Sequence, residues 1–123
     1  MKYSFIEIPI WNRKLLLVIG CSKDDLLSLV AKYKMGRGIR NMVYNTPPFP
    51  ISEGSACVYS CNISLNYIVY FPNNKVRNDT IIHETNHIVK HLMKGLGAQQ
   101  EIEAHAYTQE WLFNWIRKQI NTK

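Results

Sequence analysis

The sequence has too few cysteines for a fold that depends on disulfides. It contains three, Cys21, Cys57 and Cys61, and an odd number at irregular spacing is not typical of small secreted domains. No second cysteine pair completes a metal site with Cys57 and Cys61, so we expect the thiols to be free and buried. This cysteine usage indicates a reducing, cytoplasmic setting.

Long hydrophobic runs are also missing. The longest one, Leu15 to Ile19, is far shorter than the roughly 20 apolar residues that a membrane-spanning helix needs. Near the N-terminus, Glu7 and Pro9 interrupt any apolar stretch that a signal peptide would require. We therefore expect neither a membrane span nor a secretion signal.

Acidic residues are fewer than basic ones. Nine Asp and Glu stand against 15 Lys and Arg, which gives a formal net charge of +6. Such a balance can support binding to nucleic acid or to an anionic surface. The basic residues are scattered, however, and the densest group is Lys32, Lys34, Arg37 and Arg40. We interpret that group as a solvated helix end and loop, and we expect neither a nucleic-acid partner nor a membrane.

Alternating or continuous apolar residues predict four strands. The first is Ser4 to Ile10, and it forms a hairpin with Lys14 to Ile19, whose continuous apolar run is typical of a strand buried on both faces. A short strand is expected at Ser55 to Ser60, and the clearest alternation runs from Asn62 to Phe71. Glycines and prolines gather in Gly36 to Gly54, which we predict to be a long loop.

Three helices are predicted. Ser22 is a suitable N-cap, and an apolar stripe follows it from Lys23 to about Tyr33. The second helix runs from about Thr80 to Lys94, where two glycines end it, and the third from Ala98 to about Ile120. The sequence thus predicts an α+β fold, with one domain over residues 1–123 that combines a small, mostly antiparallel sheet with these helices.

The second predicted helix carries the pattern His83-Glu84-x-x-His87. Residues four apart lie one above the other on a helix, so both imidazoles can reach one metal ion. Glu84 is turned by about 100 degrees from His83, which lets it reach a water molecule instead of the metal. Zinc suits this set of nitrogen and oxygen donors. A solvated histidine pair is the competing interpretation, against which the apolar flank Ile81-Ile82 weighs.

A catalytic zinc needs a third protein ligand. His91 continues the four-residue spacing, but it lies about 12 Å from His83 along a straight helix and is a poor candidate. Better candidates follow the glycine turn, which would fold the next helix back against the first: Glu101, Glu103 and His105. Helical phase alone does not choose between the two glutamates.

These motifs resemble those of small phage-type and bacterial metallopeptidases of the gluzincin kind, in which His-Glu-x-x-His and a downstream Glu hold zinc. The downstream Glu of such proteins often lies in a Glu-x-x-Ala-Tyr run. Glu103 to Tyr107 matches that run, whereas the run from Glu101 has a His in place of the Tyr. The resemblance implies a zincin-like domain with one zinc ion per chain, and its ligands would be His83, His87 and Glu103.

The activity implied by the resemblance is zinc-dependent cleavage of a peptide or protein substrate, with Glu84 as the general base. Tyr107 and His105 are candidates for stabilising the oxyanion, and ordinary packing is the alternative for each. The strand from Asn62 to Phe71 is a candidate edge strand that pairs with extended substrate, and a core strand is the alternative. Two other functions stay open: a zinc-binding domain that no longer cleaves, and a basic nucleic-acid-binding module with an incidental histidine pair.

Overall fold

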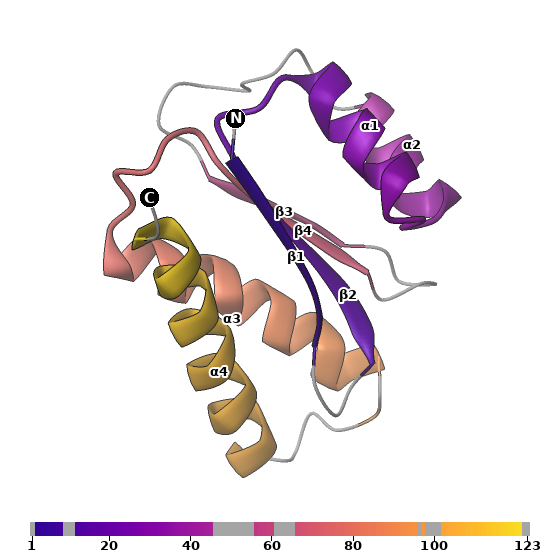
Figure 1. Ribbon diagram of the computed structural model, residues 1–123. Helices are drawn as coiled ribbons and strands as arrows, with labels where there is room; N and C mark the ends of the chain where they lie inside the picture. Colours follow the sequence, from indigo (N-terminus) through magenta and orange to yellow (C-terminus); the bar gives the residue numbers. More distant parts are fainter. Residues whose placement is uncertain are drawn as a thin grey trace.

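The computed structural model describes residues 2–8, 12–45, 56–60, 66–95, 97 and 102–121. Helices cover both faces of one central sheet (Figure 1), which confirms the predicted α+β class. None of the described helices is long and apolar enough to cross a membrane. The elements, in chain order, are β1 (Lys2–Ile8), β2 (Arg13–Ile19), α1 (Lys23–Lys32), α2 (Arg37–Asn45), β3 (Cys57–Ser60), β4 (Tyr67–Phe71), α3 (Asn78–Gly95) and α4 (Ile102–Asn121).

The four strands follow one another across the sheet in the order β1-β2-β4-β3. β1 and β2 form the predicted antiparallel hairpin, and Asn12, with a φ of 56°, donates its backbone N–H to the Ile8 carbonyl across the turn at 3.0 Å. β4 runs parallel to β2 and antiparallel to β3. The sheet is therefore mixed, with two antiparallel strand pairs and one parallel pair.

The sequence left open whether the strand ending at Phe71 is an edge strand or a core strand, and the structure shows a core strand. β4 lies between β2 and β3, and all five of its residues are buried. Its side chains enter cores on both faces of the sheet, for which a central strand is needed. In the described part of the sheet, the strand beyond β4 is β3. Residues 62–65, which the prediction also included, lie outside the described residues.

The sheet separates two hydrophobic clusters. One lies between the sheet and the helices α3 and α4, and Leu17, Val69 and Ile88 belong to it. The other lies between the opposite face and the helices α1 and α2, and it includes Val18 and Cys21. Cys21 is buried, as predicted; the side chain of residue 57 and the whole of residue 61 lie outside the described residues. Neighbouring β2 residues thus pack on opposite helical layers.

The segment predicted as a loop from Gly36 to Gly54 contains a helix in its first half. α2 begins one residue after Gly36, whose φ of 99° suits a glycine. Ile39 and Val43, four residues apart, are fully buried. The prediction was wrong because this burial outweighs the weak helix propensity of Gly38. Residues 46–55 lie outside the described residues.

The other helices follow their sequence signals closely. Ser22 caps α1 in a reciprocal pair with Asp25, as its position predicts. α3 begins at Asn78, two residues before the predicted start, and the Asn78 side-chain oxygen accepts a hydrogen bond from Arg117 of α4 at 2.7 Å. Further along, the side-chain amide of Gln109 donates to the Ile82 carbonyl. The two contacts show that α3 and α4 run antiparallel.

Candidate metal centre

The helix α3 places the motif at the boundary between the core and solvent. Ile81, Thr85 and Ile88 are fully buried on one side of the helix, and the Thr85 hydroxyl donates to the Ile81 carbonyl at 2.8 Å. His83 and His87 are exposed on the other side. Burial of the apolar side therefore fixes the direction in which the two histidines point.

The imidazoles of His83 and His87 converge. Their Nε2 atoms lie 3.1 Å apart, and their ring planes meet at 86°. Two nitrogens bound to a tetrahedral zinc at about 2.0–2.1 Å lie about 3.3 Å from each other. The pair would have to open by only a few tenths of an ångström to hold such an ion, so these two residues fit zinc as a pair of nitrogen ligands.

Glu84 lies next to the histidines on the same turn of α3, but it is buried, with only 6% of its surface exposed. Burial raises the pKa of the Glu84 carboxyl group, and the charges of His83 and His87 act in the opposite direction. A carboxylate with a raised pKa accepts a proton near neutral pH more readily than an ordinary one. Its position and basicity suit a general base.

A groove of about 460 Å³ lies between α3 and β3. Its α3 wall is formed by His83, Glu84, His87 and His91, and its other wall by Ala56, Val58 and Ser60. These last three alternate along the chain, so one face of the β3 segment is turned to the groove. The groove therefore brings the motif next to β3, one of the two edge strands of the described sheet.

His91 has a buried partner in β4. Its Nδ1 atom lies 3.0 Å from the hydroxyl oxygen of Tyr67, a fully buried residue, and the two rings meet edge to face. Burial raises the pKa of the Tyr67 hydroxyl, with an opposing effect of Arg13. Burial also lowers the pKa of His91, and Lys94 adds to that shift. Both groups thus favour their neutral forms, and His91 is half-buried at the edge of the core.

The described structure does not add a third ligand to the histidine pair. Glu103 lies in the first turn of α4, and its side chain is exposed. Among the described residues, no three His, Cys, Asp or Glu side chains are grouped so that they could hold one metal ion. Glu101 lies outside the described residues, so the choice between the two glutamates stays a prediction.

The two residues predicted to stabilise the oxyanion also lie on α4. Tyr107 is 71% exposed, and His105 is half-buried. Neither belongs to the lining of the groove. α4 contacts α3 through Ile82 and Thr85, which the helical period turns to a different side from the histidines. The roles of Tyr107 and His105 stay predictions.

Sequence reasoning missed two features of this site. The first is the contact between Tyr67 and His91. The sequence did carry a signal for the position of His91: it follows Glu84 by seven residues, or about two helical turns, so both lie on the same side of the helix. The second is the wall formed by residues 56, 58 and 60. It was missed because polar and apolar residues do not alternate clearly from Ser55 to Ser60. Comparison with known protein families, curated proteins and solved structures finds no match to this chain.

Proposed function

We propose that this protein is a zinc-dependent peptidase with a zincin-like fold. The observation that supports the proposal most is the convergence of the His83 and His87 Nε2 atoms beside Glu84, in a groove bordered by a strand. Zinc supplies Lewis-acid chemistry in such a site, because it polarises a carbonyl and lowers the pKa of water to about 7. We propose Glu103 as the third ligand.

In this proposal the metal ligands, the general base and the oxyanion-stabilising groups are different residues. His83 and His87 hold the metal through their Nε2 atoms and must be neutral to do so. The Glu84 carboxylate accepts the proton of the attacking water and returns it to the leaving nitrogen of the peptide. Tyr107 and His105 are proposed to stabilise the oxyanion, which requires that they reach the groove when substrate is present.

The strand β3 suits an extended peptide as substrate. It is one of the two edge strands of the described sheet, the other being β1, and its residues line the groove opposite the histidines. A peptide that pairs with the backbone of such a strand gains regular hydrogen bonds independently of its sequence. The small side chains of Ala56 and Ser60 leave room for those of the peptide. We therefore propose that substrate binds along β3 as an added strand.

Elemental analysis of protein purified without a metal-affinity tag tests this proposal. We expect about one zinc ion per chain in the parent and little zinc in His83→Ala/His87→Ala. The matched control is Asn86→Ala/Lys90→Ala, which changes two residues of the same helix at the same spacing and should keep the metal. A parent chain that takes up no zinc, even after equilibration with it, would refute the proposal.

The two alternative functions predict different results in this experiment. A zinc-binding domain that no longer cleaves would retain zinc but would leave a mixed peptide library intact, although its Glu84 is present. A nucleic-acid-binding module with an incidental histidine pair would contain no zinc. We place the peptidase in the cytoplasm, where the cysteine usage of the chain fits a reducing setting.

A further inference from the structure

The basic residues are spread along the chain, but most of the net positive charge arises in one part of the sequence. Residues 12–45 contain seven of the 15 basic residues and only two of the nine acidic ones, so they carry five of the six net positive charges. These residues form β2, α1 and α2. The two helices cover the face of the sheet opposite α3 and α4 (Figure 1). Most of the net charge therefore lies on the side of the molecule away from the histidine groove.

Four exposed basic residues lie between the end of α1 and the first turn of α2, and we name this group the cationic corner. Its members are Lys32, Lys34, Arg37 and Arg40. In the described part of the chain, the one salt bridge joins Arg77 to Asp79, far along the sequence from this corner. The two acidic residues of α1 lie in its first turn, at the end away from Lys32. Among the described residues, no salt bridge joins a carboxylate to Lys32, Lys34, Arg37 or Arg40; the strand β1 contributes one exposed carboxylate, Glu7, which pairs with Lys14 in the hairpin register.

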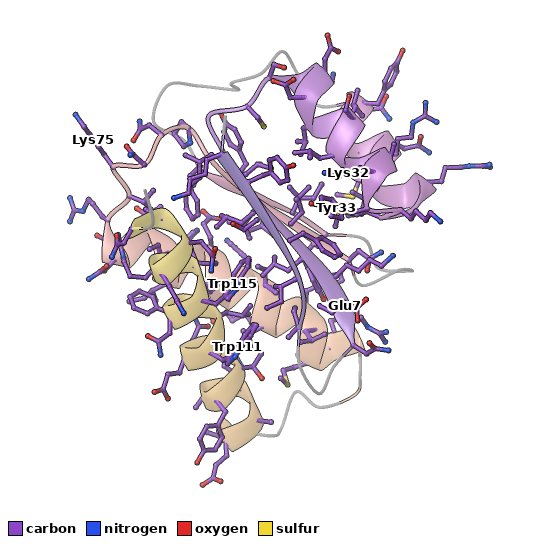
Figure 2. The ribbon with its side chains drawn as sticks, in the orientation of Figure 1. Glu7, Lys32, Tyr33, Lys75, Trp111 and Trp115 are labelled. Carbon is purple, nitrogen blue, oxygen red and sulfur yellow. The ribbon has the colours of Figure 1, made fainter. Side chains whose placement is uncertain are left out.

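Aromatic rings contact Lys32, and Lys14 of β2 hydrogen-bonds to backbone carbonyls within the cationic corner. The Lys32 ammonium lies 5.3 Å from the ring centres of both Tyr3 and Tyr33 and donates to the Tyr3 hydroxyl at 3.2 Å. That hydrogen bond raises the pKa of Lys32, which preserves its charge. The Lys14 ammonium donates to the carbonyls of Tyr33 and Lys34. Figure 2 shows Lys32 and Tyr33 on the side of the sheet that α1 covers.

The helix α2 adds to the positive potential of the corner. Its first turn contains no acidic residue, so the partial positive charge of the helix N-terminus is not offset there. Ile39 and Val43 are buried in the core, whereas Met42 and Tyr44 are exposed. The Tyr44 ring lies 5.6 Å from the Lys23 ammonium, and two separate side chains do not form the continuous apolar face that a membrane-binding helix inserts into lipid. This arrangement favours a hydrophilic polyanion over a lipid surface.

We propose that the cationic corner binds the phosphate backbone of a nucleic acid, on the face of the sheet opposite the metal groove. Lys34, Arg37 and Arg40 each offer an exposed cation to a phosphate, and Lys32 offers a fourth. The Tyr3 ring beside Lys32 is 37% exposed and gives a base or sugar an apolar surface. The sequence alone did not favour this partner, because α2 was not foreseen and the four residues were assigned to a helix end and a loop.

Fluorescence anisotropy with labelled single-stranded and double-stranded DNA and with RNA tests the proposal. Four phosphate contacts predict that log K falls with log salt at a slope of about −3 to −4. The variant Lys34→Glu/Arg37→Glu/Arg40→Glu should bind at least about tenfold more weakly, with a slope of about −1. The matched control Lys75→Glu/Lys90→Glu/Lys94→Glu changes the net charge equally, and its residues are exposed outside the α1–α2 layer. We expect it to keep most of the binding.

Three results would overturn the proposal. The parent chain could fail to bind any of these nucleic acids at low salt, or both triple variants could lose binding equally, which would make net charge the cause. Binding to vesicles rich in anionic lipid without binding to nucleic acid would assign the surface to a membrane instead. A preference for DNA or RNA, or for single or double strands, would still support a site for the phosphate backbone.

Circular dichroism shows whether each variant is folded. The variant Arg37→Gln/Arg40→Gln provides a milder test and should reduce the steepness of the salt dependence by about 1.4 to 1.8.

Discussion

The hydroxyl oxygen of Tyr67 lies 3.0 Å from Nδ1 of His91 and joins the central strand β4 to the helix that carries the metal motif. A phenol is a stronger acid than a neutral imidazole N–H, so we assign the hydroxyl as donor and Nδ1 as acceptor. This assignment places the ring proton of neutral His91 on Nε2. The contact fixes the fourth turn of α3 against the sheet, about two turns after Glu84, which lines the same groove.

Replacing Tyr67 by Phe should destabilise the protein. The substitution keeps the ring in the core but leaves Nδ1 of His91 without the hydroxyl. A hydrogen bond lost in a buried setting costs about 1–2 kcal/mol in the free energy of unfolding. Urea denaturation followed by circular dichroism measures this value. The control is Tyr44→Phe, because the Tyr44 side chain is 66% exposed and its hydroxyl can bond to water. Equal stability of the two variants would contradict the assignment.

The lowered pKa of His91 makes the metal-free protein less stable in mild acid. Burial and Lys94 disfavour the charged imidazole in the folded state, whereas the unfolded chain binds a proton at a pKa of about 6.5. The stabilisation is therefore present above pH 6.5 or so and is lost as the pH falls through the folded-state pKa. Glu84 acts in the opposite sense, since its pKa is raised in the folded state.

The effect of His91 is isolated by comparing the parent chain with His91→Gln between about pH 8 and pH 5. Stability of the parent should fall more steeply with decreasing pH than that of the variant, because Gln takes up no proton. Asn86→Gln, which changes a residue of the same helix without a titratable group, is the control and should keep the slope of the parent. A His91→Gln profile parallel to that of the parent would show that His91 does not titrate with folding.

The sequence predicted the elements whose signals are local. The hairpin of β1 and β2 follows from alternation and an apolar run, and α1 from the cap at Ser22. α2 was missed because Gly36, Gly38 and the later prolines suggested a loop. The four-residue spacing of Ile39 and Val43 did indicate a helix, but it extends over little more than one turn. Short helices depend on burial that only the folded sheet supplies.

The order of strands and the composition of the site depend on contacts distant in sequence. Helical spacing correctly placed the imidazoles of His83 and His87 together. It could not say that β3 lies beyond β4, or that Tyr67 reaches His91, because both facts require the register between strand and helix. The position of Glu103 relative to the histidines likewise depends on the glycine turn, and residues 98–101 of that turn lie outside the described residues.

Replacing Glu84 by Gln should separate metal binding from catalysis. The amide has nearly the same shape but cannot accept a proton from water, so peptide hydrolysis should fall by about 10²-fold or more while zinc stays bound. Because burial disfavours the ionised carboxyl group, the metal-free variant should be at least as stable as the parent near pH 8. Peptide cleavage, zinc content and urea denaturation measure the three effects. Glu110→Gln on the exposed side of α4 is the control, and parental activity in Glu84→Gln would refute the mechanism.

The contact of Gln109 with Thr85 should couple α4 to the helix of the metal motif. The Gln109 side-chain amide donates to the Thr85 hydroxyl oxygen and to the Ile82 carbonyl, just before His83. Its own oxygen is buried and has no hydrogen-bond partner in the described part of the chain. Replacing Gln109 therefore removes good contacts together with an unsatisfied acceptor, and we expect Gln109→Ala to cost only about 1 kcal/mol in stability.

A double-mutant cycle isolates this interaction. Gln109→Ala and Thr85→Val should together destabilise the protein by less than the sum of the single changes, with a coupling energy of about 0.5–1.5 kcal/mol. The comparison cycle combines Gln109→Ala with Ser28→Ala, since Ser28 lies on α1 across the sheet, where its hydroxyl donates to the Asp24 carbonyl. That pair should be additive within about 0.5 kcal/mol. Additivity in both cycles would mean that α4 is bound to α3 by apolar packing alone. The orientation of His83 would then not depend on Gln109.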